Sequence, residues 1–472
     1  MASKVLIVTT EMLPGLGYPT AGGGMRAYSI GEGLKSHGFH VDYSLRDSLL
    51  KEKPLPNKFT ALLHNTNNID DVINNYRPDV VVFEQWHPLL YYKSNNFPLV
   101  VDVPGPLLLE QTYKDPKELN NLAGTKINAL SKADVFCCSN SKQKGYWTAW
   151  MLLAGVPVSD FNLLEVPICA SPELPPLPPG PKDKNDLRFF HTGIYWPWQN
   201  FIPALEILSN IMEEENTGKL EIYGGKHPYH PSDENEKSPF SDSILNNNKV
   251  TIHDLVKPEE LFEAYTSGGV ALEVMSRNPE RDLSSTIRTI GFLWSGLPVV
   301  ISSYSYLVDM INDYKAGWVV NEESPEEIEK IFREIFNHPE EVSERAKGAQ
   351  NLIKDRFTWD TSTKQLAEYC KTPKRREKNP VFMEETVQRI ETASRLDFEF
   401  FEFTQRFFEA QGQLAEAEHR WSVEHDTWTA QTIDRDNALY ELNNIRNKLL
   451  FRVYKKIQKI LKFGKNDEEE LI

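Results

Sequence analysis

The sequence predicts an α/β protein in which two doubly wound, mostly parallel sheets are followed by an α-helical coiled-coil extension. Short apolar runs alternate with helical patterns over residues 1–170 and again over 187–370. The proline-dense segment 171–186 separates the two series and is expected to be a stiff linker, because it cannot hold an interior helix or strand. A chain of 472 residues is long enough to bury two or three such cores.

The first predicted domain, residues 1–170, opens on a buried strand. Apolar runs bounded by turn residues predict strands over 4–10, 41–44, 80–83, 99–103 and 135–138. Helical periodicity predicts helices over 32–37, 69–76 and 125–131. Because helices separate consecutive strands, we expect crossover connections and a parallel sheet.

The second predicted domain, residues 187–370, repeats this alternation. Its predicted strands cover 188–192, 220–223, 250–253, 270–274 and 298–301. Its predicted helices cover 201–212, 259–266, 325–336 and 340–357. Ser324 is the expected N-cap of the third of these helices, with Pro325 at its first position.

Residues 283–300 form the most informative stretch of the chain. Three hydroxyl residues, Ser284, Ser285 and Thr286, open a further helical pattern, and Arg288 follows within its first turn. Free N–H groups at a helix start, with a guanidinium beside them, form an anion site. An ordinary capped helix–strand unit is the plainer interpretation.

The ends of the predicted strands supply further candidates, since ligands of doubly wound sheets bind beyond the carboxyl ends of the strands. In the first domain a glycine loop follows the first strand, and its spacing fits neither a dinucleotide fingerprint nor a P-loop. Polar residues end two further strands, and Asp102 is either a turn cap or a catalytic carboxylate, with Glu84 as the next catalytic candidate. The first-domain binding candidates are Gly22, Gly23, Gly24, Arg26 and His87.

Two strands of the second domain also end in small residues and a polar group. Tyr195 follows the first of them, and Lys226 follows a Gly-Gly turn after the next. A lysine in such a position can pair with a phosphate, although a solvated lysine is the simpler interpretation. Arg281, just before the hydroxyl run, is a further binding candidate.

The bulk properties exclude several classes of function. The net charge of −16 argues against broad binding to nucleic acid. The four cysteines show neither metal-ligand spacing nor a disulfide framework, so a reducing cytoplasm is the expected compartment. The N-terminus shows no signal-peptide pattern, and no stretch approaches the roughly 18 apolar residues of a membrane span.

The C-terminal part predicts association rather than chemistry. Over residues 381–450, apolar residues such as Phe400, Phe407 and Leu414 recur at three- and four-residue steps, which favours a coiled coil and a homo-oligomer over a helix packed on the globular body. Residues 446–465 are rich in Lys and Arg and carry one apolar stripe. They are either an amphipathic helix on an anionic membrane surface, at the inner face of the cell membrane, or the solvated end of the coiled coil.

The order and spacing of these motifs resemble the two-domain GT-B glycosyltransferases, in the large clan that includes many bacterial surface-polysaccharide and lipopolysaccharide enzymes. The resemblance covers residues 4–370. It rests on the glycine loop, the strand at 189–192, the stretch 250–273, the 288–300 unit with its Gly-Leu-Pro-Val-Val ending, and Phe-Thr-Trp-Asp at 357–360. The segment 139–150 is also similar to that of clan members from envelope gene clusters.

The resemblance implies two Rossmann-like domains that transfer a sugar from a nucleotide diphosphate sugar, without a metal or other cofactor. The first domain would bind a glycan or lipid-linked glycan acceptor, and the second would bind the donor. Arg288, Lys226 and the helix start at Ser284–Thr286 would neutralise the leaving diphosphate. A carboxylate near the anomeric carbon would assist an oxocarbenium-like transition state.

The chain also departs from the pattern of that clan. Where many members carry two glutamates separated by seven residues, this sequence has Leu283 and Gly291. Where many carry Arg and Lys after the first strand of the second domain, it has Ile194 and Gln199. Donor contacts would then fall to other arginines, or the chain is a degenerate transferase that serves as a coiled-coil scaffold in a glycan-assembly complex.

Overall fold

The computed structural model describes residues 3–50, 61–228 and 239–378, together with residues 409, 413, 416, 440–448, 451–452 and 455. The chain divides into two compact units, residues 1–392 and 393–472, and every element below belongs to the first. In the second unit residues 440–448 are helical. The predicted coiled coil at 381–450 and the predicted basic helix at 446–465 lie almost entirely outside the described residues.

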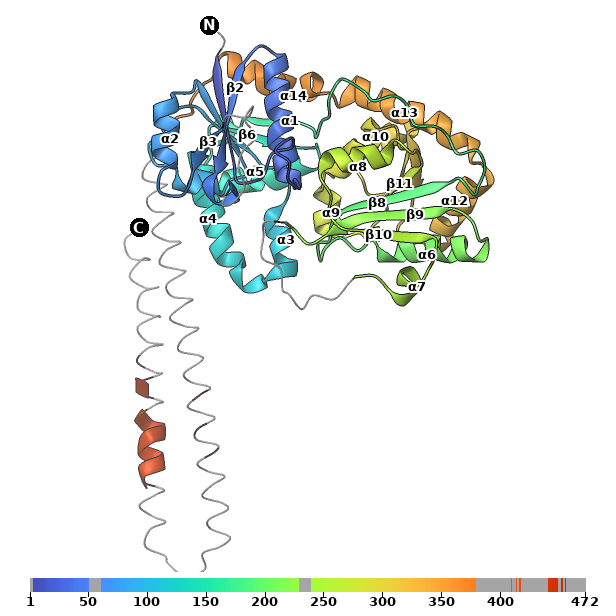
Figure 1. Ribbon diagram of the computed structural model, residues 1–472. Helices are drawn as coiled ribbons and strands as arrows, with labels where there is room; N and C mark the ends of the chain where they lie inside the picture. Colours follow the sequence, from blue (N-terminus) through green and yellow to red (C-terminus); the bar gives the residue numbers. More distant parts are fainter. Residues whose placement is uncertain are drawn as a thin grey trace, which may run out of the picture. The chain divides into compact units, whose positions relative to one another are not determined.

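The first domain contains a seven-stranded parallel sheet in the order β3-β2-β1-β4-β5-β6-β7. Figure 1 shows β2, β3 and β6 of this sheet between helices. The central strands are apolar on both faces, as expected for a sheet covered by helices on each side. The strands are β1 (Lys4–Thr9), β2 (His40–Arg46), β3 (Leu62–His64), β4 (Val80–Glu84), β5 (Leu99–Asp102), β6 (Val135–Cys138) and β7 (Leu163–Glu165). The helices are α1 (Gly22–Ser36), α2 (Ile69–Tyr76), α3 (Leu107–Lys114), α4 (Leu119–Lys132) and α5 (Gln143–Leu153).

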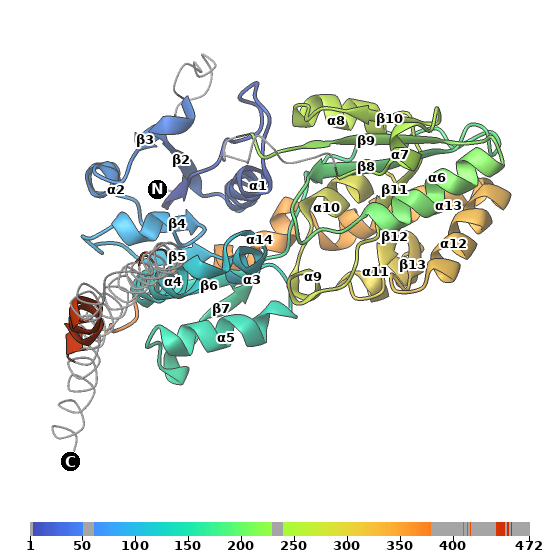
Figure 2. The ribbon, with the colours of Figure 1, turned by 90° about the horizontal axis from the view of Figure 1, so that it is seen from below.

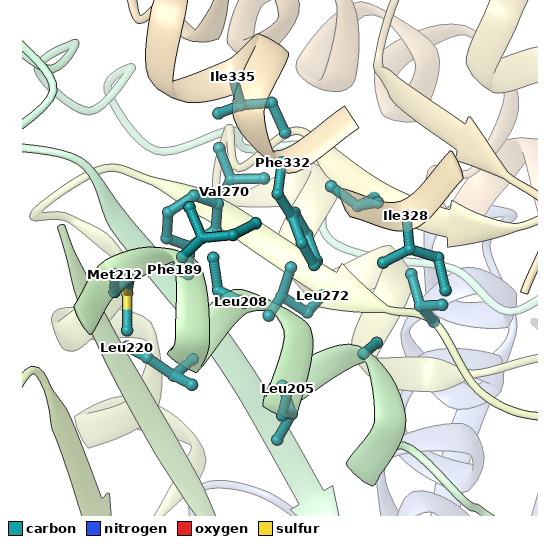
Figure 3. Close-up of a cluster of buried hydrophobic side chains, with 14 of the residues drawn as sticks. Phe189, Leu205, Leu208, Met212, Leu220, Val270, Leu272, Ile328, Phe332 and Ile335 are labelled. Atoms are coloured by element: carbon teal, nitrogen blue, oxygen red, sulfur yellow. The ribbon is translucent and has the colours of Figure 1, made fainter. Parts of the chain in front are cut away.

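The second domain contains a six-stranded parallel sheet in the order β10-β9-β8-β11-β12-β13. The strands are β8 (Arg188–Ile194), β9 (Lys219–Gly225), β10 (Val250–His253), β11 (Val270–Glu273), β12 (Val299–Ser302) and β13 (Gly317–Val320). The helices are α6 (Ile202–Glu214), α7 (Asp242–Leu245), α8 (Pro258–Tyr265), α9 (Pro279–Leu283), α10 (Ile287–Trp294), α11 (Val308–Asp313), α12 (Pro325–Asn337) and α13 (Glu340–Arg356). Leu208 of α6 and Phe332 of α12 pack onto Phe189 and Leu272 of the sheet (Figure 3).

The predicted fold class is confirmed for both sheets, and every predicted strand and helix of the two domains has a counterpart. Ser324 caps α12 as predicted, since its side chain accepts a hydrogen bond from the Glu327 N–H. The sequence did not predict β3, β7 and β13, which have only three or four residues each and lie at or next to the sheet edges.

The last helix, α14 (Trp359–Lys371), corrects the expected extent of the second domain. The sequence assigns residues 187–370 to that domain, but Leu366 and Cys370 lie in the core of the first domain. Helix α14 packs beside α1 (Figure 1), where an added Cβ on Gly33 would lie 2.4 Å from the Thr363 hydroxyl. Glycine is therefore required at the point where these two helices approach.

The linker 171–186 forms no helix or strand, as its proline content predicts. It lies along the second domain, where Trp294 donates a hydrogen bond to the Ser171 carbonyl and Gln350 donates one to the Pro175 carbonyl. Across the described part of the chain, none of the helices combines the length and apolar character that crossing a bilayer requires.

Candidate active site between the two sheets

A cavity of about 830 Å³ lies at the carboxyl ends of the strands of both sheets. The first domain lines it with the start of α1 and the end of β4, and the second with the end of β8, helix α8 and the start of α10. Ligands of doubly wound sheets bind at these strand ends. The cavity is large enough for a nucleotide-sized ligand.

The helix α1 presents an uncapped N-terminus to this cavity. Its cap residue, Ala21, offers no side-chain acceptor, and its first turn contains no acidic residue. The glycines allow close approach of the backbone, because an added Cβ on Gly22 would lie 3.2 Å from Ile287, and one on Gly23 would lie 2.8 Å from Glu84. The unpaired N–H groups and the helix dipole favour an anion at this place.

The helix α10 presents a second uncapped N-terminus from the other domain. Thr286 makes no side-chain cap, no acidic residue follows in the first turn, and all three predicted hydroxyl residues line the cavity. The starts of α1 and α10 approach each other, since Gly22 begins α1 and Ile287 begins α10. Two positive helix ends, one from each domain, therefore lie at one cavity.

Arg288 lines the cavity from the first turn of α10 and is held by three groups. Its Nε lies 3.0 Å from a Glu273 carboxylate oxygen, its Nη1 donates to the Thr192 carbonyl at 2.6 Å, and its Nη2 donates to Gln199 at 2.6 Å. Gly193, with a φ of 129°, leaves space for the guanidinium, since an added Cβ would lie 2.1 Å from Nη1. The guanidinium is oriented in advance, and Glu273 partly offsets its charge.

Glu84 ends β4 and carries its carboxyl group to the glycine loop. It is buried, its Oε2 accepts a hydrogen bond from the Thr9 hydroxyl, and no described residue bonds to its Oε1. Burial, followed by the charges of Glu11 and Asp102, raises the pKa of Glu84 to about 8. At neutral pH this carboxyl is mainly protonated and can donate a hydrogen bond.

The structure places Asp102 away from the cavity lining. Both of its carboxylate oxygens accept hydrogen bonds from Arg26, at 2.8 and 3.0 Å, and both side chains are fully buried. Arg26 reaches the lining, but it also donates to the carbonyls of Val166 and Pro167. This corrects the expectation that Asp102 faces the reacting sugar, because Asp102 and Arg26 satisfy each other as a buried ion pair, whereas Arg26 stays a binding candidate at the lining.

The other predicted site residues divide into two groups. Arg281 lines the cavity, but it is buried and paired with Glu280 at 2.5 and 2.8 Å. Four more are not among the residues that line the cavity: Gly24, His87, Tyr195 and Lys226. An added Cβ on Gly24 would lie 1.9 Å from the Met12 carbonyl oxygen, so that glycine serves backbone packing. His87 stacks on Trp86, and Tyr195 packs against Phe201 and Phe240.

Sequence reasoning missed several residues of the site. Glu273 ends β11 as Glu84 ends β4, so its position at a strand end was a usable signal. Gln85 lines the cavity with a φ of 64°, a conformation that non-glycine residues seldom adopt and that is common at functional sites. Glu110, Trp196 and Trp198 also line the cavity, and no local pattern distinguished them.

Hydrogen bonds between the domains hold the loop that precedes α10. The Asn140 side-chain amide donates to the Ser285 hydroxyl at 2.7 Å, and the Gln143 amide donates to the Leu283 carbonyl at 2.8 Å. Lys142 donates to the Tyr304 carbonyl. These residues come from the segment 139–150 that the sequence analysis singled out, and we call residues 140–143 the clasp. The clasp fixes the start of α10 relative to the first domain.

No known protein-family model matches the chain, and no curated protein matches its sequence. Solved structures do match. Sucrose-phosphate synthase from Thermosynechococcus elongatus superposes with a TM-score of 0.56 at 13% identity, over 78% of this chain and 98% of that one. HepE from Anabaena in complex with UDP and glucose gives 0.53 at 13%, over 78% and 100%. WaaG, a glycosyltransferase involved in lipopolysaccharide biosynthesis, gives 0.51 at 12%, over 78% and 100%. The chain therefore has the GT-B fold of these glycosyltransferases, as its sequence predicted.

Proposed function

We propose that the protein is a glycosyltransferase that moves a sugar from a nucleotide diphosphate sugar to a glycan acceptor. One observation carries the proposal. The uncapped N-termini of α1 and α10, from two different domains, meet at one cavity beside an oriented arginine. This arrangement suits a diphosphate held between the domains. The structural neighbours agree, since HepE was solved with UDP and glucose.

In this proposal the helix ends and Arg288 neutralise the diphosphate as it leaves, in place of a metal ion. Breaking the bond between the anomeric carbon and the phosphate oxygen leaves negative charge on the diphosphate. Fixed N–H donors stabilise such charge because they need no reorganisation during the reaction. Glu84, mainly protonated at neutral pH and next to Gly23, is the proposed acid that donates a hydrogen bond to this leaving group.

The acceptor proposed here is a lipid-linked glycan of the cell envelope. The structural neighbour WaaG, by its title, takes part in lipopolysaccharide biosynthesis. The sequence supports the same proposal through the basic stretch 446–465, which would contact an anionic membrane, and through the coiled coil at 381–450, which would pair chains. These parts would bring the enzyme to its acceptor.

Calorimetric titration with UDP, GDP and dTDP and with their glucose conjugates tests the proposal. We expect one nucleoside diphosphate to bind, with UDP as the first candidate, and its sugar conjugate to be slowly hydrolysed without an acceptor. Each titration is repeated with excess EDTA, which should leave the affinity unchanged. If the folded protein binds none of the three nucleotides, the scaffold interpretation replaces the enzyme.

A further inference from the structure

The loop between β8 and α6 carries a pair of tryptophans at the cavity. The indole rings of Trp196 and Trp198 are stacked, with centroids 5.0 Å apart and planes within 10°. Trp198 is buried, whereas Trp196 is partly exposed and lines the cavity. The Lys114 Nζ, from α3 of the first domain, lies 4.2 Å from the Trp196 ring centroid and 5.0 Å from that of Trp198. The second domain thus supplies the two indoles, and the first domain supplies the ammonium group that lies over them.

The pair of indoles is held rigidly beside the proposed diphosphate site. Arg288 bonds to Thr192 near the end of β8 and to Gln199 within the loop, so one guanidinium contacts the chain on both sides of the two indoles. The Asn278 amide donates to the Trp198 carbonyl, and its oxygen caps α9. A rigid loop loses little conformational entropy when a ligand stacks on it.

A carboxyl group lies on the same side of the cavity. Glu110 lines the cavity from the first turn of α3, and α3 lies beside α9, which carries Glu280 and Arg281 (Figures 1 and 2). Burial and the nearby Glu280 raise the pKa of Glu110 to about 7. Glu280 is engaged by Arg281, whereas no described residue donates a hydrogen bond to the Glu110 carboxyl.

The geometry points to a pyranose-binding subsite in which Trp196, Trp198 and Glu110 line the cavity and Lys114 lies over the indole rings, and we assign it to the acceptor sugar. The inference rests on the proposed function. The indole surface that lines the cavity packs against the C–H groups of a sugar ring, and the Glu110 carboxyl bonds to its hydroxyls. Lys114 lies over the indole rings and holds them beside α3. A lipid tail would not need these polar groups, and a nucleobase would not need an ammonium group against the rings.

The acceptor assignment follows from the origin of the groups. Both indoles come from the second domain, whereas Glu110 and Lys114 come from α3 of the first domain, the domain that the sequence analysis expects to bind the acceptor. The subsite is completed only when α3 and the β8–α6 loop approach each other across the cavity. A pyranose of the donor could use the same ring-stacking chemistry, so the test must separate the two sources.

The test uses the full-length protein saturated with UDP and measures saturation-transfer NMR to cellobiose, maltose and diacetylchitobiose. We expect at least one disaccharide to bind and Trp196→Ala to weaken it about tenfold. Trp196→Phe should restore most of the affinity, and Lys114→Ala should weaken binding. Lys117→Ala, an exposed lysine just beyond α3, is the matched control and should bind like the wild type.

Three results would overturn the inference. Either no disaccharide binds the UDP-saturated wild type, or Trp196→Ala binds the disaccharide as tightly as the wild type does, or Trp196→Ala loses affinity for UDP-glucose relative to UDP and for no disaccharide. The last would make the subsite a donor site. Calorimetry with UDP separates the two proposals, because Trp196→Ala should keep UDP affinity within about twofold. If the protein binds a disaccharide but not UDP, the proposed function is wrong and the pyranose subsite is still supported. If Trp196→Ala does not fold, Lys114→Ala decides.

Discussion

Replacing Arg288 separates its role in binding from its role in the fold. Its side chain is 13% exposed and its partner Glu273 is 6% exposed. Arg288→Ala would remove the proposed phosphate contact and leave a buried carboxylate without its cation. The two effects have different sizes, and a second substitution tells them apart.

The binding effect follows from the bonds that Arg288 already makes. A charge-assisted hydrogen bond contributes about 1.5–3 kcal/mol, which corresponds to roughly 10- to 150-fold in Kd. Because Glu273 already offsets part of the charge, we expect the lower end, about tenfold weaker UDP binding. Removing one partner of a buried ion pair costs about 3–5 kcal/mol of folding free energy, and the partial exposure of Arg288 again favours the lower end.

The double variant Arg288→Ala/Glu273→Gln should recover most of the lost stability and none of the lost affinity. Glu273→Gln by itself is the matched control, and it should not weaken UDP binding, because it removes the group that competes with phosphate for the guanidinium. Thermal unfolding and calorimetry measure the two quantities on the same samples. A double variant that binds UDP as tightly as the wild type would refute the assignment of Arg288 to the diphosphate.

Four further outcomes are expected. Burial raises the pKa of Glu84 to about 8 from 4.5, so between these pH values the folded state binds a proton that the unfolded state does not. The stability of the wild type relative to Glu84→Gln should therefore fall as the pH rises from about 5 to 8 and then level off, which pH-dependent unfolding scans measure. A stability difference that does not change with pH contradicts the burial argument. Asp102→Asn should lower the free energy of unfolding by about 3 kcal/mol through its partner Arg26, and a stable variant that loses turnover 10²-fold would instead make Asp102 catalytic. Asn140→Ala should loosen the clasp and enlarge the radius of gyration in small-angle X-ray scattering without UDP; an unchanged radius shows that the clasp does not hold the domains closed. Removing residues 381–472 should keep UDP binding while abolishing oligomers in sedimentation and weakening binding to anionic vesicles, and unchanged assembly would place that function in the body.

The predictions that succeeded depend on local patterns. The alternation of apolar runs with helical periodicity predicts both parallel sheets, since a strand buried on both faces must be apolar throughout. The hydroxyl run before Arg288 predicts a helix start, and α10 begins at Ile287, directly after that run. Each signal lies within about twenty consecutive residues, where spacing alone reports which side chains share a face.

The predictions that failed concern partners far apart in the chain. Asp102 ends an apolar strand, as a catalytic carboxylate would, but Arg26, which lies 76 residues earlier, donates hydrogen bonds to both of its carboxylate oxygens. Helix α14 follows the second domain in sequence, yet its apolar face completes the core of the first.

The sequence by itself therefore determined the two sheets, the linker and the place where α10 begins, because burial and helix boundaries are encoded by neighbouring residues. Only the tertiary structure decided which charges are free to meet a ligand. A buried charge must be paired or neutralised, and the partner that does so is chosen by the packing of distant elements. Arg26 and Asp102 pair with each other in this way. Glu84 forms no ion pair with a described residue, and burial favours its protonated form at the cavity.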